Sequence, residues 1–149
     1  MSRHSDCETC KICKICKMLE TASPEKVILA GAHWGVVAMR EAAGVLMVFT
    51  LDHDQGVGSI SDTAAVALGP LIKSLSAGLF TCGFEKTSVI SLGDNAAHTH
   101  FMLVGRRPAE APIFDNTPLM ARLAHKEGAR ARSVALKLRD TLETSGLIA

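Results

Sequence analysis

Residues 98–106 read His-Thr-His-Phe-Met-Leu-Val-Gly-Arg, a stretch in which two histidines lead into an apolar run. Its apolar centre predicts a β-strand over residues 98–104. In a strand, residues two apart point to the same face, so His98, His100 and Met102 form one row. Two imidazoles on one row can bind a metal, hold a phosphate, or act as base and nucleophile. Taken alone, such a pair is more typical of hydrogen-bonded strand histidines.

Short apolar or β-branched runs on either side of the central helix predict four further strands, at 26–30, 33–39, 44–51 and 86–92. Residues 63–80 have helical spacing after an N-cap at Ser61, but Pro70 interrupts them, so this helix either begins near Pro70 or kinks there. Residues 106–118 are predicted as loop, and a C-terminal helix begins at 118, with Gly128 able to divide it into two pieces. The short turns favour an α+β class, with a mostly antiparallel sheet of about five strands, a central helix and a C-terminal helix.

The bulk composition narrows the class of protein. The chain has 149 residues, 48% of them hydrophobic, which is enough for one domain with its own core. A net charge of +1 gives no reason to expect a nucleic-acid partner. The sequence has no apolar run of membrane-spanning length and no signal-peptide pattern, so we expect no membrane partner and a cytoplasmic location.

The N-terminal residues are rich in cysteine. Cys7, Cys10, Cys13 and Cys16 are spaced three apart, so each adjacent pair is a Cys-x-x-Cys. Because cytoplasmic disulfides are rare, these thiols are interpreted first as metal ligands, either all four together or one pair with ligands from elsewhere. An iron–sulfur cluster is a weaker alternative, since Lys17 follows the last cysteine where the bacterial pattern has proline. A flexible leader with inert thiols is the simplest alternative.

The order of these motifs resembles the histidine triad (HIT) superfamily. Residues 13–20 read Cys-Lys-Ile-Cys-Lys-Met-Leu-Glu, residues 44–53 form a Gly-led apolar run that ends in Asp-His, and the His-x-His strand follows a helix. The resemblance covers residues 13–106. It implies a HIT-like domain over 13–149 that follows a Cys-rich leader over 1–12. HIT proteins are often homodimers, so the resemblance also implies a possible homodimer.

The resemblance assigns roles to individual residues. Zinc would be the cofactor, held by Cys13, Cys16, His53 and His98 as in the zinc-bearing HIT proteins and the hexose-phosphate uridylyltransferases. Two thiolates and two imidazoles suit a closed tetrahedral zinc site. His100 would be the nucleophile that attacks the α-phosphate of a nucleotide.

Ligand contacts are predicted from Asn95, Met102 and Arg106, with a nucleotide-type small molecule as the partner. Met102 departs from the family, because it stands where the third histidine belongs and a thioether donates no hydrogen bond. The segment from Gly93 to His98 is also short. Three hypotheses follow: a nucleotidyl hydrolase or transferase acting on a phosphoramidate or phosphoester, a catalytically impaired zinc-stabilised binding or regulatory protein on the same scaffold, and a thiol or metal sensor that uses Cys7 and Cys10.

Overall fold

A computed structural model describes residues 13–39, 41–93, 96–110 and 117–147. Along the chain, its elements are α2 (Met18–Thr21), the 3-10 turn η1 (Pro24–Lys26), β1 (Val27–Ala30), β2 (Trp34–Ala38), β3 (Val45–Thr50), the 3-10 turn η2 (Val57–Ser59), α3 (Asp62–Thr81), β4 (Lys86–Ile90), β5 (His100–Arg106), α4 (Thr117–Ala124) and α5 (Gly128–Thr144). The predicted α+β class is confirmed, with five strands and four α-helices in the described residues. The leader predicted over residues 1–12 lies outside them.

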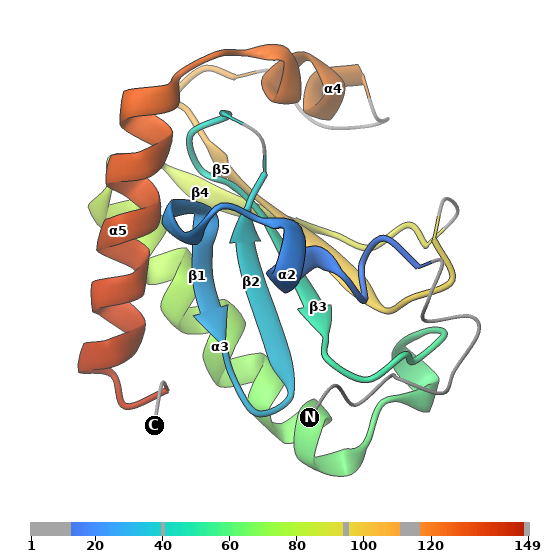
Figure 1. The fold of residues 1–149 in the computed structure, drawn as a ribbon. Coiled ribbons are helices and arrows are strands. Elements are labelled where there is room, and N and C mark those ends of the chain that lie inside the picture. The colour runs from blue at the N-terminus through green and yellow to red at the C-terminus, as the bar shows by residue number, and fades with distance from the viewer. Residues whose placement is uncertain (1–12, 40, 94–95, 111–116, 148–149) are drawn as a thin grey trace.

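The five strands form one antiparallel sheet in the order β1-β2-β3-β5-β4 (Figure 1). β2 and β3 lie in its middle and are buried at every position, so both faces of the sheet are covered. β3 pairs with β5 from Val45↔Val104 to Phe49↔His100, and this last pair lies near the end of β3 and at the start of β5. The end of β3 and the start of β5 therefore meet at one edge, which positions the site described below.

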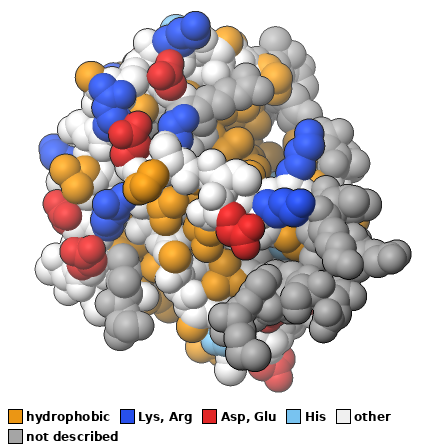
Figure 2. All heavy atoms as spheres, in the orientation of Figure 1, with side chains coloured by type: hydrophobic (Ala, Val, Ile, Leu, Met, Phe, Trp, Pro, Cys, Tyr) orange, Lys and Arg blue, Asp and Glu red, His pale blue; other side chains and the backbone are white. Residues whose placement is uncertain are grey.

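The two faces of the sheet are covered differently. α3 and α5 pack on one face, where Val36, Leu46 and Leu103 join the main core. On the other face, residues before and within α2 pack near Val37 and Met47, and α4 packs on Val45 and Val104 through Leu119. Figure 1 shows α2 in front of the sheet and α3 behind it. In the same orientation, Figure 2 shows the side of the molecule that carries α2, with hydrophobic side chains in its centre and charges of both signs around them.

α3 corrects one alternative of the sequence analysis. The helix runs unbroken from Asp62 to Thr81 with Pro70 inside it, so it does not begin near Pro70. The predicted N-cap is confirmed, because the Ser61 hydroxyl accepts a hydrogen bond from the Ala64 N–H at 3.2 Å. Proline is tolerated here because the Val66 carbonyl it leaves unbonded lies on the exposed side, where water can bond it: Val66 is 77% exposed.

α3 also passes a length-and-composition test for a membrane-spanning helix, the one described helix to do so. Such a result is weak evidence, because the core helix of a domain passes the same test. α3 packs against β4, β5 and α5, and Leu71, Leu75 and Leu79 are buried in the main core. Packing therefore explains the apolar residues on its buried side, whereas Val66 and Phe80 are exposed.

The later part of the chain differs from the prediction in the bounds of one strand, while the division of the last helix at Gly128 is confirmed. The strand predicted over 98–104 is observed at His100–Arg106, because β5 pairs with β3 only up to Phe49 and with β4 as far as Lys86↔Arg106. The predicted C-terminal helix is divided into α4 and α5, and Gly128 begins the second piece.

A buried arginine fixes α4 to the sheet. Arg122 is 5% exposed and donates hydrogen bonds to the carbonyls of Ala43 at 2.7 Å and Gly105 at 2.9 Å. It also pairs with Glu110 at 2.9 Å. Burial alone would raise the pKa of the Glu110 carboxyl, but the Arg107 N–H and the guanidinium groups of Arg122 and Arg106 outweigh it and lower that pKa. Glu110 therefore stays ionised and holds the start of the loop that leads to α4.

Two glycines make room for Phe84, which is 1% exposed. A Cβ on Gly44 or on Gly105 would clash with the Phe84 ring. Gly44 also has φ +75°, in the left-handed region that favours glycine. The turn before β3 therefore needs glycine for two separate reasons, one conformational and one steric.

We predict that Gly44→Ala lowers the free energy of unfolding by about 2–5 kcal/mol, the sum of a left-handed backbone cost and overpacking. Gly83→Ala is the matched control, since Gly83 has φ +93° but nothing near its missing Cβ. It should cost only the backbone part, about 1–2 kcal/mol. Urea unfolding followed by fluorescence of Trp34, the single tryptophan, measures both. Equal losses in the two variants would contradict the steric role of Phe84.

Candidate metal centre and histidine site

The two described N-terminal cysteines are held by a buried neighbour. Cys13 and Cys16 flank Ile15, which is 5% exposed and packs with Val37 and Phe49. A turn closes here, because the Met18 N–H donates to the Ile15 carbonyl at 2.9 Å. The apolar residue inside the Cys-x-x-Cys motif thus anchors both thiols on the face of the sheet opposite α3.

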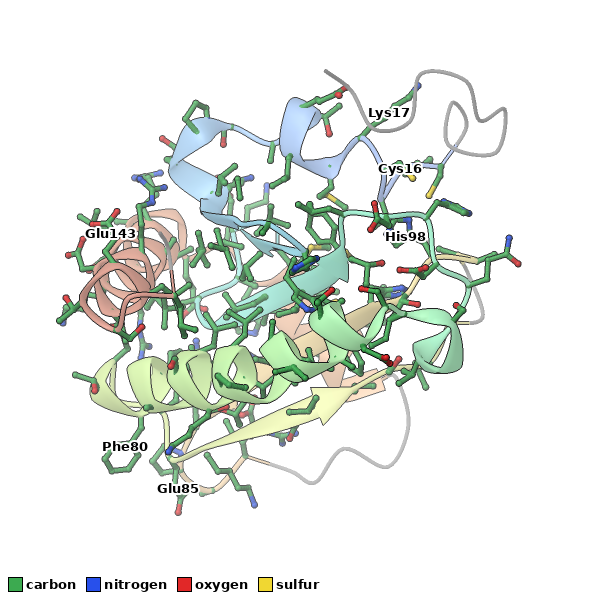
Figure 3. All side chains as sticks on the ribbon, turned by 90° about the horizontal axis from the view of Figure 1, so that it is seen from below. Cys16, Lys17, Phe80, Glu85, His98 and Glu143 are labelled. Atoms are coloured by element: carbon green, nitrogen blue, oxygen red, sulfur yellow. The ribbon has the colours of Figure 1, made fainter. Side chains whose placement is uncertain are left out.

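The four predicted metal ligands come together in space. One ligand atom from each of Cys13, Cys16, His53 and His98 lies within 4.8 Å of all the others. The Cys16 Sγ lies 3.1 Å from the His53 Nδ1 and 3.4 Å from the His98 Nδ1, and the Cys13 Sγ lies 3.5 Å from the same His98 atom. Figure 3 labels Cys16 and His98 on the same side of the molecule, far from Phe80 and Glu143.

This donor set fits a tetrahedral zinc ion. Zn–S bonds of about 2.3 Å and Zn–N bonds of about 2.1 Å at tetrahedral angles separate S from N by roughly 3.6 Å. The three sulfur–nitrogen distances given above are close to that value. When bound, such an ion would supply structural cross-linking, since four protein ligands leave no open position for substrate.

The second ring nitrogen of His98 makes the kind of hydrogen bond that is common in metal-bound histidines. His98 is 2% exposed, and its Nε2 lies 2.7 Å from the Thr50 carbonyl. A carbonyl only accepts, so Nε2 carries the proton and donates it, which leaves the Nδ1 lone pair facing the thiols. Metal-ligating histidines commonly donate their other N–H to a backbone carbonyl in this way. His53 differs, because its buried Nε2 has no hydrogen-bond partner among the described residues.

His100 is held by the backbone of the metal-site histidine. Its Nδ1 lies 2.6 Å from the His98 carbonyl, so Nδ1 carries the proton and donates it. In the neutral ring the Nε2 lone pair is then available to attack an electrophile or accept a proton. The Ser91 hydroxyl donates to the His100 carbonyl at 2.9 Å, which fixes the backbone at the start of β5.

A pocket of about 240 Å³ opens beside this histidine pair. Its described lining includes Gln55, Gly56, Ser91, His98 and His100. None of the described lining residues is Lys, Arg, Asp or Glu. An anionic group bound here would therefore depend on backbone N–H groups, neutral side chains and the histidines rather than on a cationic clamp.

The other predicted ligand-binding residues have different outcomes. Met102 lies on the same face of β5 as His100, but it is partly buried against apolar clusters and is not among the described lining residues of the pocket. Asn95 lies outside the described residues.

Arg106 is not brought to the pocket, which corrects its predicted role beside His100. It stands six residues from His100 at the far end of β5, about 20 Å away for an extended strand. There it is 3% exposed and pairs with Glu110 at 3.2 Å. His100 and Arg106 are close in the sequence, but they lie at opposite ends of an extended strand.

Sequence reasoning missed two buried threonines of the site. Thr50 and Thr99 are 2% and 4% exposed, and both bond the segments that carry the histidines. The sequence did contain one signal for them. Each threonine stands beside residues of a predicted strand, and a hydroxyl that is buried there requires a hydrogen-bond partner.

No protein-family model matches the sequence, and no curated protein matches it either. Solved structures do match. A zinc-bound histidine triad family protein from Mycobacterium smegmatis superposes with TM-score 0.66 at 11% identity, covering 93% of this chain and 98% of that one. A hypothetical histidine triad nucleotide-binding protein from Sulfolobus tokodaii gives 0.63 at 11% identity, covering 89% and 93%.

A uridylyltransferase mutant gives TM-score 0.60 at 13% identity and covers 89% of this chain. The chain spans 48% of that protein, about half its length. At such low identities these likenesses establish architecture rather than activity. With its five-stranded antiparallel sheet and the cluster of two cysteines and two histidines at the sheet edge, the chain has the fold of the histidine triad proteins.

Proposed function

We propose that this chain binds a nucleotide-type small molecule and acts on it through His100, as a nucleotidyl hydrolase or transferase. One observation carries the proposal. The His100 Nδ1–H donates to the His98 carbonyl, with nitrogen and oxygen 2.6 Å apart, and the ring lies beside a pocket of about 240 Å³. The comparisons support it, since one similar structure is named nucleotide-binding and another is a uridylyltransferase. The homodimer and the cytoplasmic location stay predictions.

The proposed chemistry has two steps, each centred on His100. The Nε2 lone pair attacks the α-phosphorus of a nucleoside phosphoramidate or phosphoester, a P–N bond forms, and the bond from phosphorus to the leaving group breaks. The leaving group takes its proton from solvent, because the Met102 thioether donates none. Water or another acceptor then attacks phosphorus, and the bond to His100 breaks. Covalent catalysis of this kind splits one difficult step into two.

A second candidate is favoured by Met102 and by the uncharged lining of the pocket. Without a third histidine and without a cationic side chain among the described lining residues, the scaffold is suited to binding a ligand without turnover. In that case the chain is a zinc-stabilised binding or regulatory protein.

We predict that His100→Ala lowers turnover of adenosine and guanosine 5′-phosphoramidates by about a thousandfold or more, because the nucleophile is lost. His125→Ala is the control, since His125 is exposed on the loop between α4 and α5. Release of ammonia and formation of the nucleoside monophosphate measure the rate. A wild-type protein that binds the nucleotide without turnover would exclude the enzyme and support the binding protein.

We predict that the wild-type protein carries about one zinc ion per chain and that Cys16→Ser loses it, because a thiolate ligand is removed. Cys82→Ser is the matched control, since Cys82 is outside the ligand cluster. Metal content by atomic emission and the thiolate bands of the cobalt-substituted protein are the measurements.

A Cys7→Ser/Cys10→Ser double variant tests the ligand set on the same samples, and under the sensor hypothesis it would also lose the response to metal or oxidant. It should keep the metal, because the four ligands that cluster among the described residues already complete a tetrahedral set. Loss of zinc in the double variant, or its retention in Cys16→Ser, would contradict the assigned ligand set.

A further inference from the structure

Thr99 stands between the two site histidines and uses all of its hydrogen-bonding groups. Its N–H donates to the Asp54 carbonyl at 2.7 Å, and its hydroxyl donates to the same carbonyl at 3.1 Å. The hydroxyl oxygen also accepts from the Gly56 N–H at 2.8 Å. The Thr99 carbonyl accepts from the Thr50 N–H at 3.2 Å. One buried residue thus bonds the end of β3 and the loop that follows it.

That loop serves both parts of the site. His53, at its start, points its Nδ1 at the Cys16 thiol in the metal cluster. Gln55, Gly56 and Val57, directly after it, line the pocket beside His100. These three residues are exposed and contribute nothing to the core clusters, so packing does little to hold them. Their position depends chiefly on hydrogen bonds.

We propose that Thr99 is a positioning residue that couples the metal centre to the pocket. A metal ion bound through His53 fixes the start of the loop, and the Thr99 hydroxyl transmits that constraint to Asp54 and Gly56. A ligand in the pocket would contact the same segment through Gln55, Gly56 and Val57. By thermodynamic linkage, metal and pocket ligand then strengthen each other's binding by the same factor.

The nucleotide part of this inference rests on the proposed function, but the metal part does not. Asp54 and Gly56 are bonded to Thr99 without any ligand in the pocket. Two sets of measurements therefore test the coupling, one without any nucleotide and one with it.

Thr99→Val removes the hydroxyl but nearly keeps the shape of threonine. The Thr99 N–H bond to Asp54 survives, and Gly56 is exposed, so water can bond its N–H. The variant therefore loses the two hydrogen bonds of the hydroxyl but keeps the backbone bond, so the protein should still fold. Serine keeps the hydroxyl and should restore the wild-type behaviour. Thr81→Val is the matched control, because Thr81 lies exposed at the end of α3 and bonds only within its helix.

The first set of measurements uses the zinc-loaded protein alone. Chelator competition gives the zinc affinity, and NMR gives the exchange rate of the Gly56 amide. Thr99→Val should weaken zinc binding by about tenfold, the size typical of residues that support metal ligands, and should speed exchange at Gly56. Thr99→Ser and Thr81→Val should match the wild type. A Thr99→Val protein with wild-type zinc affinity and Gly56 exchange overturns the proposal.

The second set repeats the zinc competition with saturating AMP. In the wild type and Thr99→Ser, AMP should raise the zinc affinity by about five- to tenfold, and in Thr99→Val this ratio should fall toward one. An unchanged ratio in Thr99→Val also overturns the coupling. If AMP binds no form of the protein, the proposed function fails, while the zinc affinity and Gly56 exchange still decide whether Thr99 positions the loop.

Discussion

The buried ring and backbone of His98 connect the parts of this site. One ring nitrogen faces the thiols of Cys13 and Cys16, and the other donates to the Thr50 carbonyl at 2.7 Å. Its backbone carbonyl accepts the Nδ1 proton of His100. Because a carbonyl cannot donate, both bonds fix the tautomer of a histidine. The cluster of candidate metal ligands and His100 are therefore parts of one hydrogen-bonded unit.

The sheet makes this arrangement possible by ending two strands at the same place. β3 and β5 are paired up to Phe49↔His100, and beyond that pair Thr99 still bonds Thr50 and Asp54 in the segments that carry His53 and His98. Both faces of the middle strands are buried, which prevents the strand ends from shifting relative to each other. The N-terminal cysteines reach the same edge because Ile15 packs on the face opposite α3.

The elements were predictable from the sequence where local chemistry decides them. Apolar and β-branched runs predicted all five strands, and Ser61 predicted the start of α3. Local patterns failed where tertiary contacts decide: Pro70 is tolerated because it faces solvent, and the predicted strand at 98 begins at His100 because its pairing partner ends. The ligand contact predicted for Arg106 failed for the same reason, because its bond to Glu110 depends on the folded loop.

The residues of the site could likewise be predicted only in part. Resemblance grouped Cys13, Cys16, His53 and His98, which no spacing rule could join, and the structure brings them together. The roles of Thr50 and Thr99 could not be read from the sequence, because each depends on a backbone group that only the fold places beside it.

The separation of the ligands along the chain has a consequence for folding. Cys13 and His98 lie 85 positions apart, so a metal ion that joins them closes a loop over more than half of the chain. Such a cross-link removes conformational entropy from the unfolded chain, and for a loop of this length the effect is about 4–5 kcal/mol by the disulfide analogy. The complete set of four ligands is assembled where β3 and β5 are paired, so a transition state that lacks this pairing gains no stability from the metal. A constraint formed after the transition state slows unfolding more than it speeds folding, so metal would act mainly on the lifetime of the native state.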